Sequence, residues 1–353
     1  MQIQKWQMSK AGSIDRLTLV KDGINDPSTD EVQVSIKAIG LNFADIFACQ
    51  GLYSATPKGK FTPGLEFSGV IIKVGKQGSK FKIGDPVMGV TRFGSYATDI
   101  NICEHYIRHL PSDWTFEQGA ALIVQGLTAW YGLIELGNLK TGQHVLVQSA
   151  AGGVGLQAIN IILKQKAIPI AVVGNSEKSN FLQKHYALKS EQIIIRNKKN
   201  FLHQINNTLD QLKITGYHIA LDAVFGNYFK PTYRHLQPMG RYILFGAADM
   251  MNQKPRPDMI TTIYKYLKRP RLDPLSMVSE NKGFLAFNLI WLFKEIKILD
   301  IILSDFLASN PGKPLIDRVF AFNSIHQAMD RLQSGLSIGK VIVTISNLHD
   351  IPN

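Results

Sequence analysis

The feature that most constrains the fold is a glycine-rich turn between an apolar strand and a helix. Residues 149–155 read SAAGGVG, directly after a strand predicted for 144–148 and before a helix predicted for about 154–166. A second apolar strand, 168–173, follows at the spacing of a βαβ unit. N–H groups at such a helix start can bind a pyrophosphate, and glycine lets the phosphate approach the backbone. We therefore expect a dinucleotide diphosphate to be bound by Ala151, Gly152, Gly153, Val154 and Gly155.

The texture on either side of this turn predicts two domains. Residues 1–125 contain short strands with period-two alternation, broken by Pro and Gly, which indicates a β-rich, barrel-like unit. Residues 126–310 alternate helices with strands, with later strands predicted at 193–195, 219–223 and 242–245, as in a doubly wound parallel sheet. The β texture returns at 311–353, so the nucleotide-binding unit interrupts a discontinuous β domain.

Composition narrows the class of protein. The formal net charge of +12 makes anionic partners plausible, and two cysteines cannot form a disulfide framework, which fits a reducing compartment. The N-terminus lacks the pattern of a secretory signal. The longest apolar stretch recognised, 283–293, is interrupted by Asn288 and is shorter than the roughly 20 residues of a spanning helix. A soluble, cytoplasmic protein is expected.

The choice of dinucleotide depends on the end of the second strand. An NAD site typically has a carboxylate about 20 residues beyond the turn, and that position is Asn175, next to Gly174. Lys178 and, after the third strand, Arg196 can pair with a 2′-phosphate. Glu177 would favour NAD if its carboxylate pointed inward, and Lys178 can equally be a solvated surface residue. The expected cofactor is NADPH.

Several motifs, in order, resemble those of the zinc-free quinone oxidoreductase branch of the medium-chain dehydrogenase/reductase superfamily. They are GLNFAD (40–45), QGLY (50–53), PGLEFSG (63–69), GDPV (84–87), QGLTA (125–129), LQPMGR (236–241) and SIGKV (337–341). The C-terminal half is most similar to the synaptic vesicle membrane protein (vesicle amine transport) subgroup. The resemblance implies a GroES-like β-barrel catalytic domain, a Rossmann domain, a cleft between them and a homodimer.

The same resemblance predicts that no metal is bound. The positions matching the catalytic zinc ligands of related alcohol dehydrogenases hold Asn42, Leu65 and Val124, none of which replaces a thiolate or imidazole. Cys103, His105 and His109 form a local cluster on a predicted surface strand, where a stray metal site is less expected than plain surface residues.

By family match, Asn42 and Tyr53 are the expected donors to the oxyanion that forms when hydride reaches a conjugated carbonyl. Tyr53 can alternatively be an aromatic lid over the nicotinamide. Phe47 stands where some members carry Tyr, which removes a proton donor. Asp45 is expected to cap the following helical turn.

Other residues are expected near the nicotinamide. Thr128 offers its hydroxyl there, or merely caps or packs its helix. Phe245, Gly246 and Ala247 follow a predicted strand on the nicotinamide side. Phe284, Leu285 and Ala286 either bind the carboxamide through their backbone or form the edge strand of a dimer, and the two roles are compatible.

One basic stretch stands apart from these motifs. Residues 254–271 contain six Lys or Arg, interleaved with Tyr264 and Tyr266 and opposed by Asp258 alone. A solvated helix explains it, and so does weak contact with an anionic membrane surface, whereas nucleic acid is not expected. The leading function is an NADPH-dependent, zinc-free reductase of quinones or α,β-unsaturated carbonyls. The alternative is a nucleotide-binding interaction or membrane-surface protein with little turnover.

Overall fold

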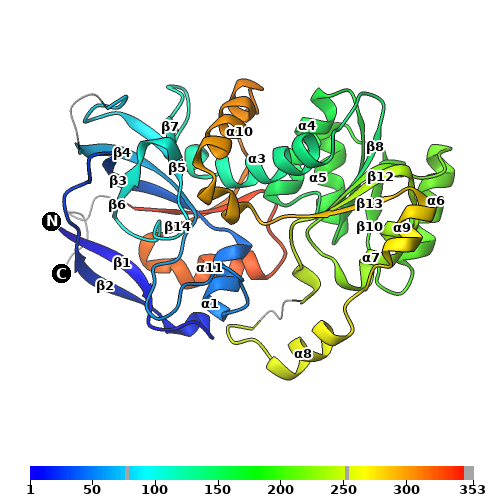
Figure 1. Cartoon of the computed structure of the whole chain (residues 1–353), viewed down its shortest axis with the longest axis horizontal. Helices are drawn as coiled ribbons and strands as arrows, with labels where there is room; N and C mark the ends of the chain where they lie inside the picture. The colour runs from blue at the N-terminus through cyan, green and yellow to red at the C-terminus, as the bar shows by residue number, and fades with distance from the viewer. Residues whose placement is uncertain (76–78, 251–253, 346–353) are drawn as a thin grey trace.

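A seven-stranded and a six-stranded sheet, with a β-hairpin beside them, organise the computed structural model across residues 1–75, 79–250 and 254–345, the part of the chain that it describes (Figure 1). The seven-stranded sheet comes from both ends of the chain and the six-stranded sheet from its middle. The expected mixed α/β fold is therefore confirmed. We call the unit with the seven-stranded sheet the catalytic domain, after the role expected for it, and the unit with the six-stranded sheet the Rossmann-type domain.

The catalytic-domain sheet has the order β14-β15-β3-β4-β5-β7, with β6 paired to β3. Its strands are β3 (Glu31–Gly40), β4 (Glu66–Val74), β5 (Pro86–Val90), β6 (Asp99–Cys103), β7 (Ile107–His109), β14 (Ile316–Ala321) and β15 (Lys340–Thr344). The hairpin is β1 (Gln2–Met8) with β2 (Leu17–Gly23), and the helices are α1 (Phe43–Gln50), α2 (Phe116–Ala120) and α11 (Ile325–Gln333). Because β15 pairs antiparallel with β3, the returning chain closes this domain. The last eight residues of the expected second segment, 346–353, lie outside the described residues.

The Rossmann-type sheet is parallel, in the order β10-β9-β8-β11-β12-β13. Its strands are β8 (His144–Gln148), β9 (Ile168–Val173), β10 (Ile193–Ile195), β11 (Tyr217–Asp222), β12 (Leu236–Leu244) and β13 (Gly283–Ala286). The helices around it are α3 (Ile123–Trp130), α4 (Gly153–Lys164), α5 (Ser176–Tyr186), α6 (Phe201–Leu212), α7 (Phe229–Arg234), α9 (Pro274–Glu280) and α10 (Ile296–Ala308).

Side chains of β8 show why this sheet needs cover on both faces. Val145 and Val147 pack into one core with α4, whereas Leu146 packs into another with Phe201 and Ile205 of α6. Successive strand residues point to opposite faces, so an apolar run of this kind is stable only between two helical layers.

The helical region 116–136 is not one continuous helix. It breaks after α2 at Ala121, resumes as α3, and ends in a π-helical segment, η3 (Tyr131–Leu136). By length and composition this region could cross a bilayer, but 67% of its most apolar window is buried inside the protein. Its apolarity is accounted for by packing, since Leu127 and Leu133 are fully buried.

A short helix, α8 (Met259–Leu267), projects from the body at the lower edge of Figure 1. The chain leading into it touches the catalytic domain: the Ile14 N–H donates to the Pro255 carbonyl at 3.1 Å, and Gln50 Nε2 donates to the Lys254 carbonyl at 2.9 Å. None of the α8 residues is buried.

Candidate functional site

The glycine turn leaves the start of α4 open. Gly152 is the N-cap residue and no side chain caps the helix, so its first N–H groups have no side-chain partner among the described residues. A Cβ at Gly155 would lie 2.5 Å from the carbonyl oxygens of Ser149 and Ala150, and one at Gly153 would overlap the Gln125 side chain. The turn is also held from the catalytic domain, because the Gly339 N–H donates to the Ala151 carbonyl at 3.1 Å. This turn therefore requires glycine and presents free donors.

The expected nucleotide residues gather at one edge of the sheet. The turn follows β8, Gly174 follows β9, Arg196 follows β10, and Phe245 follows β12, all at carboxyl ends of parallel strands. The strand order reverses at β8, between β9 and β11. In open α/β sheets ligands bind beside such a switch point.

Cations converge next to Gly174. Asn175 caps α5 by accepting the Lys178 N–H at 3.0 Å, and Lys178 Nζ donates to the Gly335 carbonyl at 2.6 Å. Burial, together with the nearby Arg196 guanidinium, lowers the pKa of Lys178 to about 8. An anion bound beside them would stabilise the protonated form of a half-buried lysine that lies next to an arginine. Glu177, the residue that would favour NAD, is exposed.

Sequence reasoning missed two neighbours of this group. Arg331 of α11 contributes a further positive charge near Lys178, although it forms a bidentate ion pair with Asp317 at 2.8 Å. Ser149 accepts a hydrogen bond from Arg196 at 3.4 Å. No sequence pattern connects Arg331 with this site, because it lies far from the turn in the chain. Ser149 could have been found, because it is the first residue of the turn.

The other half of the expected cofactor site lies on β12 and β13. Phe284, Leu285 and Ala286 form β13, which pairs in parallel with β12 as the edge of the sheet. The Phe245 N–H donates to the Asp222 carbonyl, and a Cβ on Gly246 would lie 2.9 Å from the Ala223 carbonyl oxygen. Ala247 follows directly. Carboxamide binding and strand-mediated dimerisation both stay predictions.

Tyr53 lies where the two domains meet. Its hydroxyl donates to Asn288 Oδ1 at 2.7 Å. Asn288 follows β13 of the Rossmann-type domain, with Phe287 between them. Burial raises the pKa of Tyr53 to about 12, so the hydroxyl keeps its proton at physiological pH. It is thus a neutral donor held at the boundary of both domains.

Asn42, expected as a second donor, is committed elsewhere. Its Nδ2 donates to Glu66 Oε1 at 3.0 Å and to the Gly40 carbonyl at 3.2 Å, and its Oδ1 accepts from Lys340 at 2.7 Å. Lys340 also forms a buried ion pair with Glu66. Both amide hydrogens are therefore used within the protein, in a network that we call the Asn42 network (Asn42, Glu66, Lys340).

Asp45 completes the start of α1, as its sequence position predicted. Its Oδ2 accepts the Asn42 N–H at 2.8 Å and the Tyr96 hydroxyl at 3.1 Å. Burial raises the pKa of Asp45 to about 7, against the lowering effect of these hydrogen bonds. Thr128 is likewise engaged: its hydroxyl donates to the Val124 carbonyl at 2.7 Å within α3. Thr128 retains acceptor capacity, and its contact with a nicotinamide stays a prediction.

The positions that match zinc ligands do not form a metal centre. Leu65 and Val124 pack in an apolar cluster with Ala55 and Ile290, against Tyr53 and Phe93. Such side chains supply none of the N, O or S atoms that zinc requires. Within residues 1–75, 79–250 and 254–345, no three His, Cys, Asp or Glu residues come together as a metal site, and this holds for the Cys103, His105 and His109 cluster.

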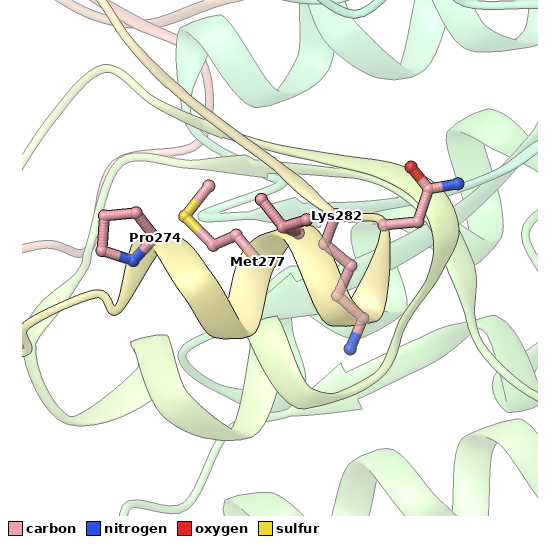
Figure 2. Close-up of a pocket in the computed structure, with 5 residues that line it drawn as sticks. Pro274, Met277 and Lys282 are labelled. Carbon is pink, nitrogen blue, oxygen red and sulfur yellow. The ribbon is translucent and has the colours of Figure 1, made fainter.

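A shallow hollow on α9 lies outside this candidate site. Figure 2 shows the side chains that line it, along one helix: Pro274, Met277, Val278, Asn281 and Lys282. Lys282 is paired with Glu280 at 2.8 Å. The hollow lacks the convergent polar groups of a catalytic site.

Comparison with known families agrees with the fold. Residues 28–112 match the alcohol dehydrogenase GroES-like domain, and residues 190–343 match the zinc-binding dehydrogenase family. These matches, with the two sheets, define the class: a medium-chain dehydrogenase/reductase, which confirms the resemblance inferred from the motifs.

Similar proteins narrow the class further. The human synaptic vesicle membrane protein VAT-1 homolog is 31% identical over 323 residues, which covers 90% of this chain and 79% of that protein. The CurK enoyl reductase structure has a TM-score of 0.79 at 26% identity, covering 98% of this chain and 99% of that one. Escherichia coli quinone oxidoreductase complexed with NADPH has a TM-score of 0.78 at 23% identity, covering 97% and 99%. The chain belongs to the family of synaptic vesicle membrane protein VAT-1 homologs.

Proposed function

We propose that the protein is an NADPH-dependent oxidoreductase that transfers hydride, without zinc, to quinones or α,β-unsaturated carbonyl compounds. The observation that carries this proposal is the uncapped start of α4 beside the Lys178 and Arg196 cations. A diphosphate matches the free N–H donors, and a 2′-phosphate matches the two cations. The NADPH complex of E. coli quinone oxidoreductase, which is similar in fold, supports the same choice.

The chemistry follows from the residues on the catalytic-domain side. A reduced nicotinamide supplies a hydride when bound. Tyr53 has a single O–H hydrogen, which it donates to Asn288 Oδ1 here; when substrate binds, the hydroxyl turns from Asn288 and donates to the carbonyl oxygen that becomes negative. Its raised pKa keeps the proton on the hydroxyl. The Asn42 network holds the start of α1 and the N–H of Val124, and so positions the wall of the site rather than donating to substrate.

The apolar cluster around Leu65 supports a reduction rather than the oxidation of an alcohol. Oxidation of an alcohol in this fold relies on a Lewis acid, and Leu65 and Val124 offer no ligands for one. Conjugated carbonyls and quinones accept hydride at carbon and require only a hydrogen-bond donor at oxygen. The similarity to the CurK enoyl reductase supports this substrate class.

A titration with NADPH and NADH, followed by a panel of quinones and enones, tests the proposal. We expect tighter NADPH binding and acceptor-dependent NADPH oxidation. Tyr53→Phe should lower kcat about 10²-fold, as for loss of one oxyanion donor, while Tyr264→Phe on exposed α8 should not. Tight NADPH binding with no oxidation by any acceptor would overturn the catalytic part, and one tightly held zinc per chain would overturn the metal-free part.

A second candidate function, contact with an anionic membrane surface, is favoured by α8. Its apolar residues face solvent: Ile260 is 83% exposed and Leu267 is 64% exposed. Lys268 and Arg269 lie over the rings of Tyr264 and Tyr266, at 4.6 and 3.9 Å from the ring centroids. A helix with exposed apolar side chains and adjacent cations is typical of interfacial helices.

Vesicle flotation tests this second function. We expect binding to vesicles containing phosphatidylserine but not to neutral vesicles, with each cation contributing about 1 kcal/mol at low salt. Lys268→Gln/Arg269→Gln should weaken binding, while the matched surface variant Lys198→Gln/Lys199→Gln should not. Equal loss in both double variants would mean a general effect of net charge and would overturn a role for α8.

A further inference from the structure

One arginine beside Tyr53 has no fixed anionic partner in the described part of the chain. Arg92 follows β5 and is exposed, and its positive charge lies near enough to Tyr53 to act against the burial that raises the pKa of that hydroxyl. Arg108 and Arg331 each bind a carboxylate, and Arg241 binds the Leu136 carbonyl. For Arg92, across the described residues, the partner is an aromatic ring instead.

That ring belongs to Trp291, on the 3-10 helix η7 (Leu289–Lys294). Arg92 Cζ lies 5.3 Å from the ring centroid, and Lys294 Nζ lies 4.8 Å from the same centroid. Trp291 is 40% exposed. Two cations thus contact one half-exposed ring, three residues after the Asn288 that accepts the Tyr53 hydroxyl.

The surroundings of Tyr53 provide the other end of a ligand site. Tyr53 packs with Phe93 and Leu65 against the apolar cluster, and Phe93 adjoins Arg92 in sequence. A ligand carbonyl at Tyr53 would therefore lie next to this apolar cluster, and Arg92 would be close enough to act on it electrostatically, as it acts on the Tyr53 hydroxyl. Guanidinium binds carboxylate or phosphate in bidentate fashion, so a cation without a fixed carboxylate favours an anionic ligand.

We propose that the acceptor carries an anionic group, carboxylate or phosphate, which Arg92 binds beside Trp291 while the conjugated carbonyl lies at Tyr53. This inference rests on the proposed reductase function and names its substrate class. Arg92 is then a specificity-determining residue, and Lys294 adds to the positive field at the same ring.

Matched acceptors test it. One pair is a 4-oxo-2-alkenoic acid and its methyl ester, and a second is a phosphorylated enone and its parent alcohol, which separates phosphate from carboxylate. We expect kcat/KM to favour one anionic member, and Arg92→Gln to reduce that anion-to-neutral ratio about tenfold or more, mainly through KM. Arg92→Lys should retain part of the ratio, and Arg234→Gln, a matched surface variant, all of it. An unchanged ratio in Arg92→Gln would overturn the inference.

A binding measurement separates this inference from the reductase function. The saturated 4-oxoalkanoic acid and saturated phosphate analogue cannot be reduced, and calorimetry on NADPH-loaded protein gives their affinities directly. We expect at least one to bind about tenfold more weakly to Arg92→Gln than to the native protein, with a steep dependence on salt. If no acceptor is reduced but this difference persists, the reductase function fails and the anion site stands; equal binding to both proteins overturns the anion site.

Discussion

The Asn42 network and helix α8 show two opposite uses of basic residues in one chain. Lys340 is fully buried and paired with Glu66, whereas Lys268 and Arg269, directly after α8, are exposed and contact tyrosine rings. Lys178 lies between these extremes, partly buried beside Arg196. The net charge of +12 therefore cannot be attributed to a single anionic partner. Burial separates the cation that holds the fold from those that we propose to select a ligand or to contact a membrane surface.

The largest expected effect comes from the buried end of this comparison. Lys340→Met leaves the Glu66 carboxylate buried without its cation, and should lower the free energy of unfolding by about 3–5 kcal/mol. Urea denaturation measures this. The double variant Glu66→Leu/Lys340→Met should be less destabilised than the single variant. A loss of less than 1 kcal/mol in the free energy of unfolding of Lys340→Met would mean that the buried cation is no more important for stability than the exposed cations beside α8.

The next effect is on nucleotide choice. Lys178→Ala should lower the preference for NADPH over NADH about 10- to 100-fold, because a charge-assisted contact to the 2′-phosphate is lost. Equilibrium titration of both nucleotides measures the ratio. Lys184→Ala, an exposed lysine on the same helix, is the control and should leave the ratio unchanged. An unaltered ratio in Lys178→Ala would refute the assignment of this residue.

A smaller effect concerns protons. With a pKa of about 8, lowered by burial and Arg196, Lys178 is about half protonated at pH 8. A bound 2′-phosphate raises that pKa, so NADPH binding at pH 8 should take up about half a proton, and NADH binding should take up less. Calorimetry in two buffers of different ionisation enthalpy measures the difference. Lys178→Ala should abolish it; persistence there would assign the uptake to another group.

The smallest effect belongs to the exposed end. Lys268→Gln/Arg269→Gln should change the free energy of unfolding by less than about 0.5 kcal/mol. Both side chains are exposed, and neither forms an ion pair with another described residue. Urea denaturation beside Lys340→Met gives the direct contrast. A loss above 1 kcal/mol would mean that α8 is a structural element of the fold.

Local sequence patterns predicted the strands and the glycine turn, which depend mainly on residues close together in the chain. The strands 144–148, 168–173 and 193–195 match β8, β9 and β10, because apolar runs bounded by turn residues have few other uses. The glycine turn was equally clear. The break between α2 and α3 was not, since the apolar spacing continues through it.

Long-range side-chain partners account for the rest. Glu66 and Lys340 are 274 positions apart, and Arg92 meets Trp291 only because β5 and η7 come together in the fold. No periodicity in the sequence connects such pairs. The same reason explains Asn42, whose family match suggested a donor before its amide was known to be committed to Glu66 and Gly40.

Gly339 and Lys340 are consecutive, and they serve different domains. The first binds the glycine turn through the Ala151 carbonyl, and the second holds the start of α1 through Asn42 and Glu66. A single peptide unit thus joins the contact with the glycine turn of the Rossmann-type domain to the buried ion pair of the catalytic domain. The two domains are therefore linked through these two residues. A chimera that takes one domain from a relative should keep the contacts of both Gly339 and Lys340.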